Sequence, residues 1–197
     1  MTTSSTGRAH DADRGQYTDR AGAPEPIGDR FTARRPVEDD FARVQHGLTH
    51  WWGGLGGEAG AQQRRLLVPR LFLQHFTGTS MVVEDAEDPG GPLAAFLIGF
   101  LSQDRPDEAY IHFVGVAPEH KRAGIGSALY ERFFALARDA GRSRVRCITG
   151  PANAASVAYH TRMGFRIEDG DHEVDGVAAK ADYDGEGLAR VCFVRDL

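Results

Sequence analysis

The segment over residues 116–129 constrains the fold most, because a strand, a short basic loop and a helix follow one another in it. Gly124 and Gly126 stand where the helix begins, and Lys121 and Arg122 come directly before them. Glycines at a helix start let the backbone approach a ligand closely, and the unpaired N–H groups there attract an anion. The segment therefore predicts a phosphate-binding turn, with a plain strand-to-helix turn as the alternative.

Two well-known glycine-rich phosphate motifs do not fit this chain. A Walker loop requires Gly-x-x-x-x-Gly-Lys-Ser/Thr, and the sequence contains no such run. A dinucleotide-binding fingerprint requires a third small residue at the position that Leu129 occupies. The glycine tract over residues 54–60 follows a predicted helix instead of a strand, so we expect a loop there.

A second segment, over residues 153–165, has the pattern of a capped helix of about three turns. Together the two segments resemble the GNAT superfamily of acetyl-CoA-dependent N-acetyltransferases. That family's pyrophosphate loop, Gln/Arg-x-x-Gly-x-Gly/Ala, is matched by residues 121–126, with lysine in the first place. The family's later helix carries an asparagine, a small residue, two aromatic positions and a Gly-Phe pair. These are matched by Asn153, Ser156, Tyr159, His160, Gly164 and Phe165.

The order of the predicted elements agrees with that resemblance. Apolar residues at helical spacing predict helices over residues 37–52, 62–76, 125–140 and 153–164, with Pro69 starting or kinking the second. Strands are predicted over residues 30–33, 80–84, 93–101, 109–116, 144–149, 165–168 and 190–194. We therefore expect the α/β (α+β) GNAT fold, a mixed central sheet of about six to seven strands flanked by about four helices.

The N-terminal part differs in composition from the rest of the chain. Residues 1–29 contain no Leu, Val, Phe or Trp, so they cannot bury enough apolar surface to offset the entropy of ordering the chain. We predict a disordered head over residues 1–28 and an acetyltransferase domain over residues 29–197.

Composition narrows the location and the partners. The net charge of −5 argues against general nucleic-acid binding, and the longest apolar run, residues 92–101, is about half a membrane span. Only two cysteines occur, so a disulfide scaffold is excluded and Cys147 and Cys192 are expected to be buried and reduced. We predict a cytoplasmic protein with no nucleic-acid partner and no membrane partner.

The resemblance implies acetyl-CoA as the acyl donor and no metal. The pantetheine arm would lie between the strands over residues 109–116 and 144–149, and N–H groups near Val114 and Val116 would polarise the thioester carbonyl. Gly115 is consistent with the bulge that the family places in this strand. The remaining cofactor contacts would come from Lys121, Arg122, Ala123, Gly124, Ile125, Gly126, Ser127, Asn153, Ser156 and Tyr159.

His112 is the favoured general base, because an imidazole with a pKa of about 6.5 suits that task at neutral pH. Strand alternation would put Tyr110, His112 and Val114 on one face, so Tyr110 joins the catalytic candidates. A histidine bonded within a half-buried sheet is the alternative interpretation of His112. Glu108, at the start of the strand, is a weaker candidate base, and a solvated turn residue is the preferred interpretation of it.

The general acid departs from the family pattern. His160 stands where the family usually has tyrosine, and it would donate a proton to the departing thiolate or only bond the sulfur. Tyr159, which precedes it, is read as a packing residue in preference to a catalytic one.

The acceptor side of the site is the least specified. Trp51, Trp52 and Phe76 are the candidate pocket residues, because adjacent tryptophans on a helix cannot both point inward. The segment over residues 182–187 is expected to be a turn before the last strand, near the acceptor.

We predict acetylation of a small-molecule amine; a protein lysine or N-terminal acetyltransferase and a non-catalytic acyl-CoA sensor are the alternatives. Members of the family commonly form homodimers, so a homodimer is an alternative to a monomer.

Overall fold

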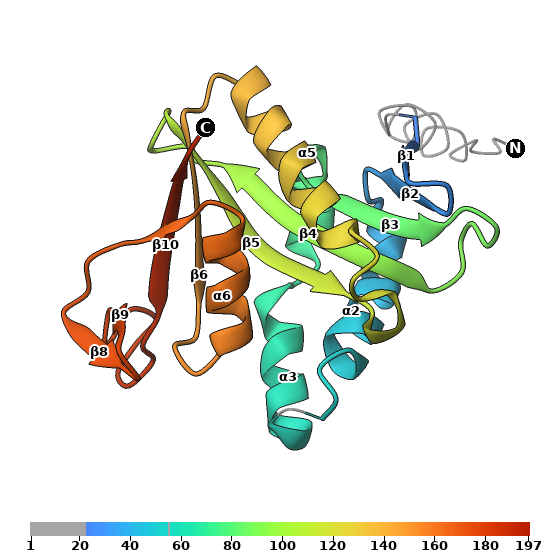
Figure 1. Ribbon diagram of the computed structural model, residues 1–197. Helices are drawn as coiled ribbons and strands as arrows, with labels where there is room; N and C mark the ends of the chain where they lie inside the picture. Colours follow the sequence, from blue (N-terminus) through green and yellow to red (C-terminus); the bar gives the residue numbers. More distant parts are fainter. Residues whose placement is uncertain (1–22, 55) are drawn as a thin grey trace, which may run out of the picture.

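Eight strands form one sheet in the computed structural model, which describes residues 23–54 and 56–197 (Figure 1). Their spatial order is β1-β2-β3-β4-β5-β6-β10-β7, and a separate hairpin consists of β8 (His172–Val174) and β9 (Val177–Ala179). The strands of the large sheet are β1 (Glu25–Ile27), β2 (Phe31–Arg34), β3 (Met81–Asp85), β4 (Leu93–Leu101), β5 (Glu108–Val116), β6 (Arg144–Thr149), β7 (Arg166–Ile167) and β10 (Val191–Asp196).

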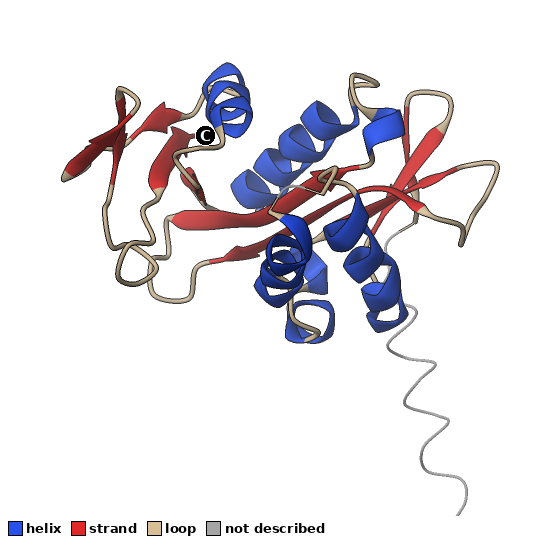
Figure 2. Cartoon of the chain, turned by 90° about the horizontal axis from the view of Figure 1, so that it is seen from below, coloured by secondary structure: helices blue, strands red, loops and turns tan. Residues whose placement is uncertain are grey.

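Helices cover both faces of this sheet (Figure 2). One face carries α5 (Ile125–Asp139) and α6 (Ala154–Arg162), and the other carries α2 (Phe41–His50), α3 (Gly57–Leu67) and α4 (Leu71–His75). Short 3-10 turns are η1 (Glu38–Asp40), η2 (Thr77–Thr79) and η3 (Pro118–His120). The α/β class and the mixed sheet are confirmed, and the sheet has one strand more than the six to seven expected.

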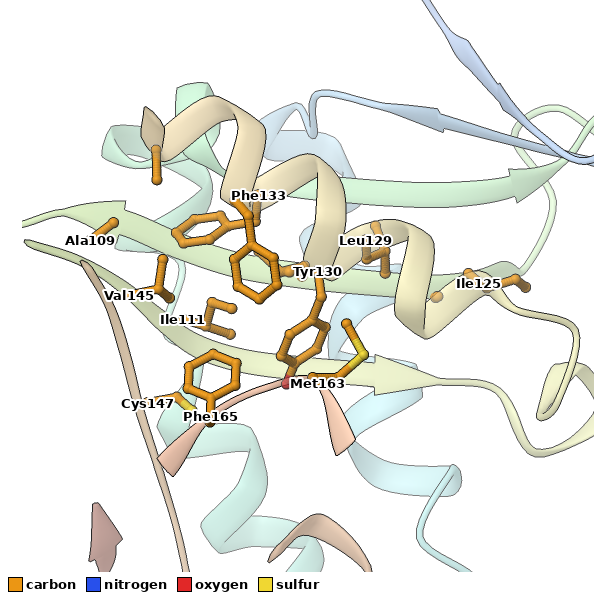
Figure 3. Close-up of a cluster of buried hydrophobic side chains, with 14 of the residues drawn as sticks. Ala109, Ile111, Ile125, Leu129, Tyr130, Phe133, Val145, Cys147, Met163 and Phe165 are labelled. Atoms are coloured by element: carbon orange, nitrogen blue, oxygen red, sulfur yellow. The ribbon is translucent and has the colours of Figure 1, made fainter. Parts of the chain in front are cut away.

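The sheet separates two apolar cores. The core beneath α5 joins Phe133 and Tyr130 of that helix to Ile111 and Val145 of the central strands and to Phe165 (Figure 3). The core beneath α2–α4 is built from Val44, Leu48, Trp51, Val68, Leu73, Val82, Leu93, Phe96, Ile98 and Ala117. Burial on both faces explains why β4 reads as a continuous apolar run instead of an alternating one.

β5 and β6 separate soon after they begin. They form the one parallel pair among the described strands of the large sheet, and only three residue pairs join them: Glu108–Arg144, Ala109–Val145 and Tyr110–Arg146. β5 continues along β4 as far as Val116, whereas β6 turns away along β10. The sheet is therefore open between the two strands beyond Tyr110.

A bulge in β5 corrects the predicted alternation of its side chains. Ile98 of β4 pairs with Phe113 and the next residue, Gly99, pairs with Ile111, so His112 is an extra residue without a partner. His112 and Phe113 consequently both face the α2–α4 side, where they stack on Phe72 and Phe96. Val114 packs against the opposite core, so it does not share a face with His112 as predicted. The bulge expected at Gly115 lies at His112 instead, because the register changes at Gly99 of the neighbouring strand.

The predicted helix over residues 62–76 is two helices. α3 ends at Leu67 and α4 begins at Leu71, because Pro69 lacks the N–H that a continuous helix needs at that point. α3 also starts earlier than predicted, at Gly57, within the tract that was expected to be a loop. Ala59, Ala61 and the glutamines that follow favour a helix strongly enough to include Gly60.

The boundary of the predicted head also moves. Glu25–Ile27 pairs with β2 as strand β1, and the Ile27 side chain is buried in the core beneath α5. Backbone pairing can order such a short strand with a single apolar anchor, which composition alone does not reveal. Residues 1–22 of the predicted head lie outside the described residues.

Two further expectations concern the cysteines and the membrane. Cys147 and Cys192 are both buried and unbonded, as predicted. Within the described residues, no helix has the length and apolar character that crossing a bilayer requires.

A buried ion cluster fixes α2 to the sheet. The Arg34 guanidinium lies 2.7 Å from Asp40 and 2.8 Å from Glu84, and Arg43 lies 2.7 Å and 2.6 Å from the same two carboxylates. Burial alone would raise the pKa values of Asp40 and Glu84, but the arginine hydrogen bonds outweigh it and hold both below their ordinary values of 3.8 and 4.5. Asp40 therefore has a structural role.

Replacing Asp40 with asparagine tests this cluster. Because the pKa of each carboxyl is lower in the folded than in the unfolded chain, the stabilisation is present above about pH 4 and is lost as the pH falls through the folded values. We expect Asp40→Asn to lower the free energy of unfolding at pH 7 by about 3 kcal/mol and to weaken its decline between about pH 4 and pH 2. Urea unfolding over that range measures both effects. Asp39→Asn, at an exposed neighbouring carboxylate, is the matched control and should leave both unchanged.

Candidate active site

A cavity of about 590 Å³ lies where β5 and β6 diverge. Its walls come from Ile111 and Val114 of β5 and from Cys147 and Thr149 of β6, and it extends to the starts of α5 and α6. Most of the residues predicted to bind the cofactor line it: Val114, Val116, Lys121, Arg122, Gly124, Ile125, Gly126, Ser127, Asn153, Ser156 and Tyr159. Ala123 belongs to the same loop but does not line the cavity.

The basic loop and the start of α5 give one end of this cavity a positive potential. Gly124 precedes the helix in the left-handed region, with a φ of 80°, and Arg122 adopts a φ of 68°. The first intrahelical bond runs from the N–H of Ala128 to the carbonyl of Gly124, so the N–H groups of Ile125, Gly126 and Ser127 have no partner within the helix. With Lys121 and Arg122 exposed beside them, these donors can bind an anionic group such as a phosphate.

Tyr159 approaches this helix start closely. A Cβ atom on Gly126 would lie 2.9 Å from the Tyr159 hydroxyl oxygen, so only glycine at position 126 leaves room for the tyrosine. The hydroxyl oxygen is shielded from solvent and makes no well-formed hydrogen bond within the described chain. Burial raises the pKa of Tyr159, and the nearby Ser127 hydroxyl offsets part of that effect. Tyr159 is thus a neutral donor at the wall of the anion site, beyond the packing role predicted for it.

The open side of β5 presents backbone N–H groups toward the gap. The N–H of Ala117 donates to Ala94 at the β4 side, and N–H directions alternate along a strand. The N–H groups of Val114 and Val116 consequently point away from β4, toward the side from which β6 has separated. Among the described strands, none pairs with this open side of β5 beyond Tyr110, so the two donors are available to an acceptor in the cavity.

Asn153 has the capping role that its position predicts. Its side-chain oxygen accepts a hydrogen bond of 3.2 Å from the N–H of Ser156 at the start of α6, and Gly164 ends the segment in the left-handed region. The cap places Ser156, Tyr159 and His160 on the side of α6 that borders the cavity.

His112 is held by a single hydrogen bond through one ring nitrogen. Nε2 lies 2.5 Å from the Leu67 carbonyl oxygen, and because a carbonyl only accepts, Nε2 must carry the hydrogen. The ring stacks on Phe72 at 4.5 Å between centroids, and burial lowers the pKa of His112. Nδ1 therefore holds a lone pair at neutral pH, on a residue that lines the cavity.

His160 has both ring nitrogens occupied. Nδ1 lies 2.8 Å from the carbonyl oxygen of Ser156 and so donates to it, while Nε2 lies 2.9 Å from the Tyr130 hydroxyl and accepts from it. The ring is buried, stacks on Phe193, and has a pKa lowered by that burial. His160 is a neutral bridge between α6 and α5.

The residues predicted to line the acceptor pocket, and the catalytic candidate Tyr110, lie in different parts of the structure. Trp52 lines the cavity, whereas Trp51 is buried in the core beneath α2–α4 against Phe96. Tyr110 faces a second cavity of about 320 Å³ and stacks on Phe100, and Phe76 packs behind that phenylalanine without lining either cavity. The two cavities meet at Cys147 and Ile148, which line both.

The second cavity contains charged residues that the sequence did not point to: Arg105, Arg146, Glu168 and Lys180. It also contains Glu108, which is buried and is therefore not the solvated turn residue that was expected. Arg146 lies 2.8 Å from Glu108 and 2.5 Å from Glu168, partners far apart in sequence. The one sequence feature that could have pointed to this cavity is Lys180, because the chain has only two lysines. The turn expected over residues 182–187 contributes Tyr183 to this cavity.

Comparisons with known proteins identify the family of this chain. Residues 46–165 match the Acetyltransferase (GNAT) family. The L-2,4-diaminobutyric acid acetyltransferase of Nocardia farcinica (strain IFM 10152) is 30% identical over 96 residues, which are 49% of this chain and 48% of that protein. The chain thus matches about half the length of this relative.

Two solved structures are similar in fold. Ard1 from Thermoplasma volcanium has a TM-score of 0.63 and 21% identity, over 85% of this chain and 97% of that one. Diaminobutyrate acetyltransferase EctA from Paenibacillus lautus, in complex with L-2,4-diaminobutyric acid and coenzyme A, has a TM-score of 0.54 and 23% identity, over 83% and 93% of the two chains. At these identities, the likeness is one of fold.

The arrangement around His160 makes a testable prediction. At neutral pH we expect the Nδ1–H tautomer, and because burial lowers the pKa of His160, its titration midpoint should lie below 6.5. The Tyr130 hydroxyl favours the neutral ring, because it donates to an unprotonated Nε2. Tyr130→Phe removes this donor, so the titration midpoint of His160 should rise and the free energy of unfolding should fall by about 1 kcal/mol. Nitrogen-15 NMR of labelled histidines measures tautomer and midpoint. Tyr159→Phe, next to His160 on α6, is the control. A protonated Nε2 in the unaltered protein would contradict the assignment.

Proposed function

The chain belongs to the Acetyltransferase (GNAT) family, and we propose that it is an acyltransferase that moves an acetyl group from acetyl-CoA to the amine of a small molecule. The observation that carries the proposal is the cavity between β5 and β6. It combines an anion-binding helix start, two backbone donors without a strand partner and a neutral histidine.

The residues at the start of α5 fit the phosphates of acetyl-CoA. The N–H groups of Ile125, Gly126 and Ser127 would bond the pyrophosphate, with Lys121 and Arg122 supplying positive charge. The Tyr159 hydroxyl, which lacks a well-formed hydrogen bond, would add a donor there. Acetyl-CoA would supply the acetyl group as a thioester.

The N–H groups of Val114 and Val116 would act as the oxyanion donors. They point into the gap between β5 and β6 and are fixed by the pairing of β5 with β4, so they need no reorganisation during the reaction. Their action would polarise the carbonyl that the amine attacks and stabilise the negative charge that develops on its oxygen.

His112 would be the general base. The attacking amine nitrogen forms the new bond to the acetyl carbon and loses a proton, which Nδ1 of His112 can take directly or through water. The carbon–sulfur bond of the thioester would break in exchange, and CoA would leave as a thiolate that takes its proton from water. The Leu67 carbonyl fixes the ring with Nδ1 unprotonated, and the lowered pKa keeps it so below pH 6.5. His160 is assigned a positioning role in place of the predicted acid role, because neither of its nitrogens is free. Tyr110 is assigned to the acceptor side, since it lines the second cavity.

The acceptor class rests on the size of the site and on the relative. The relative from Nocardia farcinica acts, by its name, on L-2,4-diaminobutyric acid, which makes that diamino acid the first acceptor to test. A cavity of about 320 Å³ suits a small molecule better than a folded protein. Acetylation of a protein amine and non-catalytic acyl-CoA sensing are the competing functions.

Release of CoA thiol during steady turnover separates these functions. We expect acetyl-CoA to stabilise the protein against heat and to be consumed when L-2,4-diaminobutyrate or another small amine is added. Stabilisation without turnover of any amine would favour the sensor, and turnover only with peptides would favour protein acetylation. Absence of any stabilisation by acetyl-CoA would overturn the proposed cofactor.

His112→Gln tests the base. Glutamine keeps an N–H that can donate to the Leu67 carbonyl but cannot take a proton, so kcat should fall on the order of 10²-fold while acetyl-CoA binding is retained. In the unaltered enzyme the acidic limb of the kcat/KM profile should lie below pH 6.5, because burial lowers the pKa of His112. His120→Gln, at another histidine that lines the cavity, is the control. An unchanged kcat in His112→Gln would remove His112 from the mechanism.

A further inference from the structure

The second cavity adjoins the proposed reaction centre from the α2–α4 side of the sheet. Tyr110 lines it and stacks on Phe100, which in turn contacts Phe76 at the end of α4. Cys147 and Ile148 line both cavities at the point where β5 and β6 diverge. A molecule in the second cavity would therefore reach the thioester end of the first without crossing the core.

The charges in this cavity are almost all paired with one another. Glu108 is buried and pairs with Arg146 at 2.8 Å and with Arg105 at 3.3 Å, and Arg146 also pairs with Glu168. These two carboxylates and two guanidiniums balance in charge. Lys180 adds a positive charge, and within the described part of the chain it has no ion pair. The cavity therefore has a surplus positive charge carried by one flexible side chain.

The backbone of Lys180 is fixed by hydrogen bonds, although its ammonium has no ion-pair partner among the described residues. Its backbone N–H donates to Arg190 at 2.8 Å, and its carbonyl accepts from the N–H of Arg190 at 3.0 Å, which anchors the residue beside β10. Of 23 basic residues, only Lys121 and Lys180 are lysine, and each lines one of the two cavities. A lysine ammonium is a compact charge on a flexible stem, so it can follow a small anionic ligand.

We propose that the second cavity binds the acceptor and that Lys180 binds a carboxylate of it, so that the acceptor is a free amino acid and not a simple amine. This inference rests on the proposed acetyltransferase function. A volume of about 320 Å³ holds one small amino acid but no folded partner, and Tyr183, 44% exposed, stands at the wall as a partial cover. The carboxylate on Lys180 leaves the reacting amine to extend past Cys147 and Ile148 toward the first cavity.

Matched acceptor pairs test this inference, because each pair differs only by the carboxylate. The pairs are L-2,4-diaminobutyrate with 1,3-diaminopropane, L-lysine with cadaverine, and L-phenylalanine with phenylethylamine. We expect the unaltered enzyme to use at least one amino acid with a kcat/KM more than tenfold above that of its decarboxylated partner. Lys180→Met should raise the KM for that amino acid at least tenfold and leave the KM for acetyl-CoA and for the simple amine unchanged.

Two further variants test whether the effect depends on the positive charge and whether it is specific to Lys180. Lys180→Arg keeps the positive charge and should retain most of the preference for the amino acid. Lys121→Met, at the other lysine, should raise the KM for acetyl-CoA without changing the ratio between amino acid and amine. Turnover without a preference for the carboxylate, or an equal loss for both members of a pair in Lys180→Met, would overturn the inference and leave the proposed function intact. Turnover of no amine at all would overturn both.

Discussion

The short parallel contact between β5 and β6 is the constraint on which the rest of the site depends. After three residue pairs the strands diverge, so the carboxyl end of each strand is free to lead into its own helix. β5 leads through η3 and the basic loop into α5, and β6 leads into α6. Ligand sites form at such carboxyl ends because helix starts, loops and unpaired backbone donors gather there. The helix start, the donors of Val114 and Val116 and both cavities all border this one gap.

The part of the candidate site at the starts of α5 and α6 could be predicted, because it depends on short runs of sequence. Gly124 in the left-handed region, the unpaired donors of α5 and the Asn153 cap each depend on a few consecutive residues, and the sequence displays them directly. The residues predicted to bind the cofactor, except Ala123, accordingly line one cavity. The bulge at His112 could not be predicted in this way, because it arises from the register against Gly99, a residue of another strand. A single extra residue moved Val114 to the opposite face from His112.

The second cavity shows the same limit on a longer scale. Its charged residues come from the loop before β5, from β5 and β6, from the residue after β7 and from the strand bridge at Lys180, which only the folded sheet brings together. Composition could not distinguish Arg146, paired twice, from any of the other arginines of an arginine-rich chain. The rarity of lysine was readable, but its meaning depended on seeing that Lys121 and Lys180 lie on two cavities that share a wall.

The two histidines show that hydrogen-bond partners, and not residue type, decide which side chain can act as a base. Burial lowers the pKa of both His112 and His160, so both rings are neutral at physiological pH. His160 donates to Ser156 and accepts from Tyr130, so its lone pair is already used and its ring joins α6 to α5. His112 donates to the Leu67 carbonyl and keeps the lone pair of Nδ1, and the bulge turns it toward α4 and away from the core beneath α5. The bulge against β4 and the hydrogen bonds of α6 therefore distinguish a histidine with a free lone pair from one whose lone pair is already used.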